Sequence, residues 1–182
     1  VIDSGLNVDD ETGASGRYEG SFYWGIREAN GATAESGVDS AALSLSNSLL
    51  NLSVFLEDEL PAIDPSTATT AEPRVDIDGT NAPGFRLRTA DDVPDDFVLL
   101  HVMSGRADLV NLDIASGLVD DQGEPVALTV LVDRGAILGF RYDDAFGFDE
   151  NISGEGGVRI ESDGVITFSG TNDYTGGTHV VK

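Results

Sequence analysis

Short runs of alternating apolar and polar residues, separated by glycine-rich corners, make up most of this chain. The last stretch has the clearest pattern: VRI at 158–160, VITF at 165–168 and THVV at 178–181. A period of two predicts strands with one buried face, and glycine, Asn and Asp between the runs favour tight turns. Residues 151–181 are therefore predicted to form very short strands joined at sharp corners.

Alternation also appears near the start of the chain, in residues 37–63. Leu50, Leu52, Val54 and Leu56 alternate there with Asn51, Ser53, Phe55 and Glu57, which predicts strands with one buried and one exposed face. Short apolar runs are ambiguous, so an amphipathic helix through 43–56 is the competing interpretation.

Residues 74–148 continue the strand pattern. Val75, Ile77, Phe85 and Leu87 are predicted to point inward, with a turn between the two pairs. Further strands are predicted in FVLLHV at 97–102, DLVNLDIASG at 108–117, VALTVLV at 126–132 and AILGFRYDDAFGF at 136–148. One helix is predicted, over SFYWGIREANGA at 21–32, with Ser21 as N-cap and Gly31 as the stop signal.

Length and composition favour a single turn-rich β domain. The chain has 182 residues with 22 glycines, one Trp and one Met, so it has many corners and few bulky side chains. It has no cysteine, which excludes disulfides and thiolate metal sites. Packing and strand ladders must stabilise it.

The charge is strongly acidic. Asp and Glu number 33 against 10 Lys and Arg, a net charge of −23, and Lys182 is the single lysine. Such a surface repels phosphate backbones and anionic headgroups, so neither nucleic acid nor a membrane surface is an expected partner. No apolar run reaches membrane-spanning length, and the first residues do not form a signal peptide.

A series of local motifs resembles the passenger domains of bacterial autotransporters. The motifs follow in order: IREAN at 26–30, ELPAI at 59–63, DIDGTNAPGF at 76–85, NLDIASG at 111–117, RGAI at 134–137 and NDYTGGT at 172–178. The resemblance implies a right-handed parallel β-helix over residues 1–182. Residues 1–36 would form an N-terminal cap region with the short helix, and 37–182 the β-helix rungs.

The spacing of apolar residues is compatible with such a solenoid. Ile77 and Leu99 are 22 residues apart, and Leu112 and Val130 are 18 apart, near the short end of solenoid periods. In this arrangement Asn111 is expected at a corner, stacked with polar neighbours on the rungs above and below.

The resemblance also implies a cellular location for the protein. It would be an extracellular, Gram-negative outer-membrane-associated segment, followed by further rungs and an outer-membrane β-barrel. The expected function is a non-enzymatic stalk or adhesin scaffold whose partner is a surface glycan or protein. Loops 64–73, 89–96 and 118–125 are the candidate contact regions, and an exposed row of aromatic residues would favour sugar stacking.

Catalytic motifs are few. His101 lies in an apolar run, His179 lies in the last strand, and no GxSxG motif occurs, so a serine hydrolase is not expected. The alternative function is a polysaccharide lyase or glycosidase of pectin-lyase-like architecture. That function requires carboxylates or arginines that converge on one outward face, and no catalytic residue is assigned.

One acidic segment has the composition of a cation site. YDDAFGFDEN at 142–151 gathers Asp143, Asp144, Asp149 and Glu150 around glycine, and calcium binds such oxygen ligands. Neither an EF-hand nor the GGxGxDxUx nonapeptide is present. A solvated acidic corner is the other interpretation of the same residues.

Overall fold

The computed structural model describes residues 26–27, 29–30, 40–45, 53–56, 59–65, 73–89, 93–94, 96–119, 122 and 125–181. Within these residues the protein is all-β, and helical residues occur only at 26–27 and 29–30. No helix in the described part of the chain is long and apolar enough to cross a membrane.

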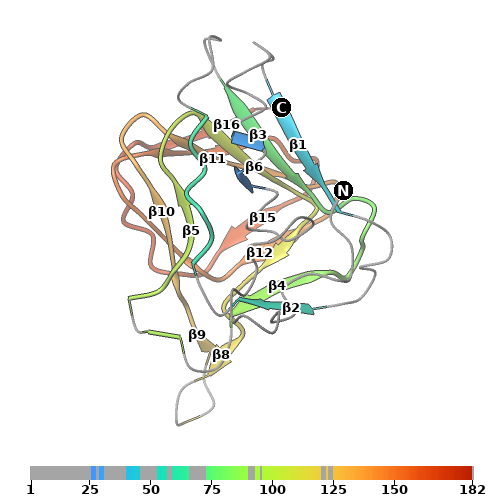
Figure 1. The fold of residues 1–182 in the computed structure, drawn as a ribbon, viewed down its shortest axis with the longest axis vertical. Helices are drawn as coiled ribbons and strands as arrows, with labels where there is room; N and C mark the ends of the chain where they lie inside the picture. Colours follow the sequence, from blue (N-terminus) through green and yellow to red (C-terminus); the bar gives the residue numbers. More distant parts are fainter. Residues whose placement is uncertain are drawn as a thin grey trace.

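The largest sheet has six strands, all parallel (Figure 1). In spatial order they are β1 (Ser40–Ser44), β3 (Arg74–Asp78), β6 (Arg106–Val110), β11 (Ile137–Arg141), β14 (Gly157–Ile160) and β16 (Thr178–Val180). Their spatial order is also their order along the chain. Between two of these strands the chain leaves the sheet, passes through other sheets and returns one strand further on.

Between its passes through the six-stranded sheet, the chain contributes strands to three smaller parallel sheets. The first contains β2 (Ser53–Leu56), β4 (Arg86–Thr89) and β7 (Asp113–Ile114). The second contains β5 (Val98–Val102), β10 (Thr129–Val132) and β13 (Asn151–Ser153). The third pairs β12 (Phe146–Phe148) with β15 (Ile166–Phe168). Among the described strands the one antiparallel pair is β8 (Leu118–Val119) with β9 (Pro125–Val126).

The register between successive passes is regular. Ile77 pairs with Leu109, Leu109 with Phe140, Phe140 with Ile160, and Ile160 with Val180. From the numbering, these steps are 32, 31, 20 and 20 residues. The chain therefore makes longer passes upstream and shorter ones near its C-terminal end.

The spacings expected from the sequence are wrong because they join strands of different sheets. Leu99 lies in β5, whereas the partner of Ile77 is Leu109 in the six-stranded sheet. Val130 pairs with Leu100 and Ile152 and not with the region of Leu112. Apolar alternation located the strands, but it could not tell which strands share a sheet.

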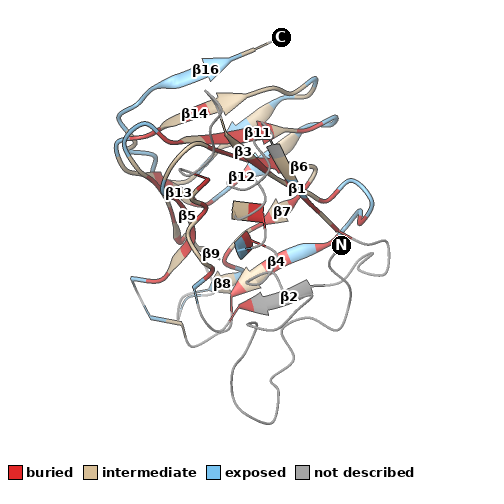
Figure 2. Cartoon of the chain, turned by 45° about the horizontal axis from the view of Figure 1, so that its top comes forward, coloured by how far each residue is buried: buried red, intermediate tan, exposed pale blue. Residues whose placement is uncertain are grey.

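One apolar core lies between the sheets (Figure 2). Val75, Ile77, Phe85 and Leu87 are all buried in it, as predicted from their alternation. Near the C-terminal end the core is aromatic, with the Phe140 ring packed edge-on against Phe148 and Phe168. The strand β16, at the edge of the six-stranded sheet, is exposed along its length.

Polar side chains link successive corners. Asn111 has a φ of 47°, a left-handed conformation that Asn tolerates better than most residues. Its side-chain amide donates to Thr80 Oγ1 (3.2 Å) and Asp143 Oδ2 (3.0 Å), and its Oδ1 accepts from the Asp143 N–H (3.1 Å). The predicted stacking of Asn111 between polar neighbours on the adjacent passes is confirmed.

The N-terminal predictions are partly covered by the described residues. Ile26 and Ala29 are helical and buried, and Asn30 donates from Nδ2 to the Ala62 carbonyl (2.9 Å). The rest of the predicted helix 21–32, with Leu50 and Leu52, lies outside the described residues. The competing helix through 43–56 is wrong for the part that is described, because 43–44 and 53–56 are in strands.

Candidate functional site: an arginine and carboxylate cluster on the six-stranded sheet

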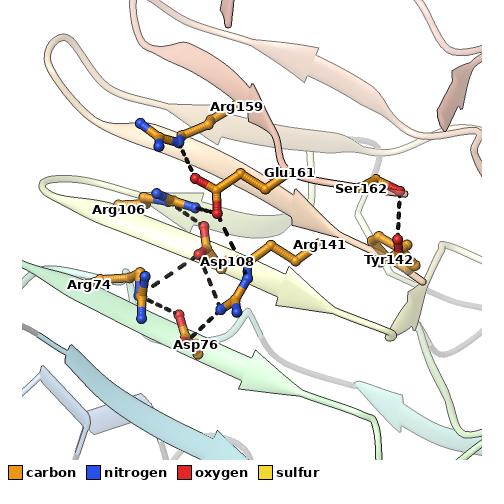
Figure 3. Close-up of polar contacts among 9 residues, drawn as sticks. All are labelled: Arg74, Asp76, Arg106, Asp108, Arg141, Tyr142, Arg159, Glu161 and Ser162. Carbon is orange, nitrogen blue, oxygen red and sulfur yellow. Dashed lines mark hydrogen bonds and ion pairs between the residues drawn. The ribbon is translucent and has the colours of Figure 1, made fainter. Parts of the chain in front are cut away.

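A charged cluster lies on one face of the six-stranded sheet, across β3, β6, β11 and β14 (Figure 3). Strand alternation produces it: the inward residues of β3 are Val75 and Ile77, so Arg74 and Asp76 face outward. The parallel register then places Asp108, Gly139 and Arg159 in one row with Asp76. The cluster consists of Arg74, Asp76, Arg106, Asp108, Arg141, Arg159 and Glu161.

Asp108 lies at the centre of this cluster and is completely buried. Arg106 Nε donates to Asp108 Oδ1 at 2.5 Å. The other carboxylate oxygen of Asp108, Oδ2, lies 3.9 Å from Arg74 Nε and 3.8 Å from Arg141 Nη1. Three arginines from three strands therefore surround one carboxylate.

The two outer carboxylates extend the network across the sheet. Asp76 contacts Arg74 Nε at 2.8 Å and Arg141 Nη1 at 3.2 Å. Glu161 contacts Arg106 Nη2 at 3.0 Å and Arg159 Nε at 2.5 Å. The ion pairs thus connect β3, β6, β11 and the end of β14, four successive passes of the chain.

Gly139 provides the space that this network occupies. A Cβ at this position would lie 2.8 Å from Asp108 Cγ and 3.2 Å from Arg106 Nε. The Asp108 carboxylate lies directly over the glycine, so any side chain at position 139 would displace it. This glycine is needed for close approach and not for a positive φ, because it lies within β11.

The surroundings in the cluster shift the pKa values of two of its carboxyl groups in opposite directions. Burial raises the pKa of Asp108, and the arginine beside it only partly offsets that effect. The guanidinium of Arg106 lowers the pKa of Glu161 to about 2. Four arginines against three carboxylates give the cluster a formal charge of +1, in a chain whose net charge is −23.

The arrangement is suited to holding strands together. Each carboxylate contacts at least two arginines, and the most buried one, Asp108, has no exposed surface for a substrate. A general acid or base must reach the reacting group. In the geometry seen here the carboxylates are engaged by arginines and connect neighbouring strands.

The four carboxylates proposed from sequence for calcium lie in different surroundings. Asp143 accepts from Asn111 at a corner, and Asp144 is exposed in the same turn. Asp149 accepts from the Ser169 hydroxyl, whereas Glu150 is buried and accepts from the backbone N–H groups of Ser116 and Leu128, each at 2.5 Å. Among the described residues, no group of three or more His, Cys, Asp or Glu could hold a metal ion.

Neither histidine has a described ion pair with the charged cluster. His101 is half-buried in β5, with Nε2 3.1 Å from Asp133 Oδ2. His179 lies in the exposed β16, in register with Arg159. Neither contacts a serine hydroxyl in the described contacts, so no nucleophile–base pair is formed there.

Sequence reasoning did not find the charged cluster. Arg74 and Asp76 are each 32 positions from their counterparts Arg106 and Asp108, and Arg141 is 20 positions from Glu161, so no short segment of the sequence contains the cluster. The available signal was the motif Arg-x-Asp, present as RVD at 74–76 and RAD at 106–108. With the correct register, this repeated motif would have placed the two pairs side by side.

Comparison of the chain with protein-family models, with curated proteins and with solved structures gives no match.

Proposed function

We propose that the chain is a right-handed parallel β-helix and that it belongs to the passenger-domain class of surface proteins. The parallel pairing of successive passes supports this proposal, as does the single core enclosed by the sheets. The right hand follows from the general handedness of parallel crossover connections. The helical residues 26–27 and 29–30, with Ile26 buried, belong to the proposed N-terminal cap.

The function that this geometry supports best is a non-enzymatic scaffold, a stalk or adhesin segment at a bacterial surface that presents a binding surface to glycans or proteins. One observation carries the proposal: all five strand pairs of the main sheet are parallel and stack successive passes of the chain. Such stacking gives a stiff body built from nearest-neighbour contacts. The ion-pair cluster serves this role, because it links four passes on the outer face.

The proposal is tested by a glycan array combined with assays for reducing ends and unsaturated products. A scaffold is expected to retain bound glycan without releasing product. Turnover of any polysaccharide, with no stable binding, would contradict it.

One second candidate is a polysaccharide-acting enzyme. Arginines and carboxylates converge on one outward face, which is the feature that such chemistry requires. If this candidate is right, Asp76→Asn and Arg141→Ala abolish turnover while the fold persists. If both variants leave any measured turnover unchanged, the cluster is not its origin.

A further inference from the structure

A groove of about 630 Å³ has none of the charged cluster's residues in its lining. One wall is the hairpin β8–β9, with Leu118, Val119 and Pro125. The opposite wall consists of Asp149, Ser169 and Thr171, from two successive passes of the chain. Its volume is within the range of about 300–1,000 Å³ that is typical of small-ligand sites.

The buried Glu150 side chain holds the segment that forms the apolar wall of this groove. Its two carboxylate oxygens accept from Ser116 and Leu128, which flank the segment that contains the hairpin. The Ser116 hydroxyl also donates to the Val126 carbonyl. Because the two Glu150 bonds are buried and join both ends of the segment, the apolar wall has a defined position against the polar wall.

The two walls differ in chemistry. Val119 keeps 63% of its surface exposed, although an aliphatic side chain of this size is ordinarily buried. The polar wall is also exposed, and the Ser169 hydroxyl donates to Asp149 Oδ1. An aliphatic face opposite hydroxyls and a carboxylate fits the C–H face and the hydroxyl edge of a sugar ring, without an aromatic residue.

The charge of the groove selects the kind of sugar. Arg88 lines it, but both of its terminal nitrogens are bound to the Asp113 carboxylate at 3.2 Å. In the part of the chain that the structure describes, the hydrogen bonds of Asp149 and Glu150 involve a hydroxyl and backbone N–H groups and no arginine or lysine. Asp149 is thus the exposed charge of the groove that no arginine neutralises in the described contacts, because burial raises the pKa of Glu150. In a chain of net charge −23, this field attracts cations and repels uronates or sulfated sugars.

We propose that this groove binds a cationic amino-sugar oligosaccharide. A protonated amine contacts Asp149, the sugar hydroxyls bind at Ser169 and Thr171, and the aliphatic wall covers the ring. The inference rests on the proposed scaffold function, for which it names a ligand and a place of attachment.

The experiment is calorimetric titration of the whole chain with a glucosamine hexasaccharide at mildly acidic pH. The fully N-acetylated hexasaccharide and an oligogalacturonate of equal length are the neutral and anionic comparisons. The cationic sugar is expected to bind, the neutral one to bind more weakly and the anionic one not to bind. Asp149→Asn is expected to reduce the affinity about tenfold, as the loss of one ionic contact.

Asp163→Asn is the matched control, because it removes one exposed carboxylate outside the groove. If both variants weaken binding equally, the attraction is a general effect of net charge and the inference is wrong. No binding of the cationic sugar would also overturn it. A different glycan retained on the array without turnover would then leave the scaffold proposal intact, so the two failures are distinguishable.

Discussion

At the scale of single residues, two positions carry backbone or packing requirements that no other residue type meets equally well. Gly139 leaves room for the buried Asp108 carboxylate, and Asn111 adopts a left-handed conformation while bonding to two neighbouring corners. Both positions connect passes of the chain that are far apart in sequence. Their substitution therefore tests the stacking of passes, and not only the local structure.

Gly139→Ala is expected to destabilise the protein by about 1–3 kcal/mol, because its Cβ overlaps with the Asp108 carboxylate. Urea unfolding followed by circular dichroism measures the change. Gly147→Ala is the control: it also lies within a strand, and its nearest neighbour would be 4.0 Å away. Equal effects of the two substitutions would contradict the assigned role of Gly139.

Asn111→Ala and Asn111→Gly separate backbone strain from the side-chain bonds. Both variants lose the bonds to Thr80 and Asp143, but only Ala has a Cβ that disfavours a φ of 47°. Asn111→Ala is expected to be less stable than Asn111→Gly by about 1 kcal/mol. Thermal and urea unfolding of the pair check this, and a Gly variant that is the less stable of the two would refute it.

At the scale of elements, the sequence predicted strands better than it predicted their partners. The alternation of Val75 with Ile77 and of Phe85 with Leu87 depends on local burial, so it can be seen in a single segment. The pairing of Ile77 with Leu109 depends on the length of everything between them, including β4, β5 and the segments that join them. No local pattern contains that information, and for this reason the predicted spacings failed.

Closeness in sequence was an equally poor guide to which acidic residues lie together. Asp143 and Asp144 were grouped with Asp149 and Glu150 because they are close in sequence, yet strand β12 separates the two pairs. Glu150 in particular is turned into the protein to bind backbone N–H groups. The charged cluster that does form draws its members from separate strands, and only the register brings them together.

The ion pairs between elements predict how stability depends on pH. The pKa of Glu161 is lowered to about 2 by Arg106, so its folded-state pKa is below the unfolded value near 4.5. Glu161 therefore contributes stability that is fully present above the unfolded pKa and is lost as the pH falls towards 2. Glu161→Gln is expected to cost on the order of 2 kcal/mol at neutral pH.

The measurement is urea unfolding of both proteins at several pH values between neutral and acidic. The difference in the free energy of unfolding between wild type and Glu161→Gln should shrink as the pH falls below the pKa of Glu161 in the unfolded state. Asp108 acts in the opposite sense, since its pKa is raised by burial and its ionised form weakens the fold as the pH rises. A difference for Glu161→Gln that does not change with pH would contradict the assigned ion pairs.

At the scale of the whole molecule, charge opposes the compact state. A net charge of −23 on 182 residues causes self-repulsion, and dissolved salt screens exposed charges more than buried ones. The melting temperature is therefore expected to rise between low and molar sodium chloride, because screening of the surface outweighs the loss at the partly buried cluster. Calorimetry in sodium chloride, with sucrose as an uncharged comparison, checks this, and a fall in melting temperature with salt would contradict it.

The most direct test of the stacked architecture is disulfide formation between paired cysteines, in a chain that has none of its own. His101, Leu131 and Ser153 form one row across β5, β10 and β13, with Leu131 next to both of the others. Neighbouring parallel strands lie about 4.8 Å apart, within the Cα range of a disulfide, whereas strands two apart do not. Cysteine pairs at 101/131 and 131/153 are expected to form intramolecular disulfides on mild oxidation, and the pair at 101/153 is expected to stay reduced; a folded protein in which 101/153 closes, or in which neither neighbouring pair does, would contradict the stacking of successive passes.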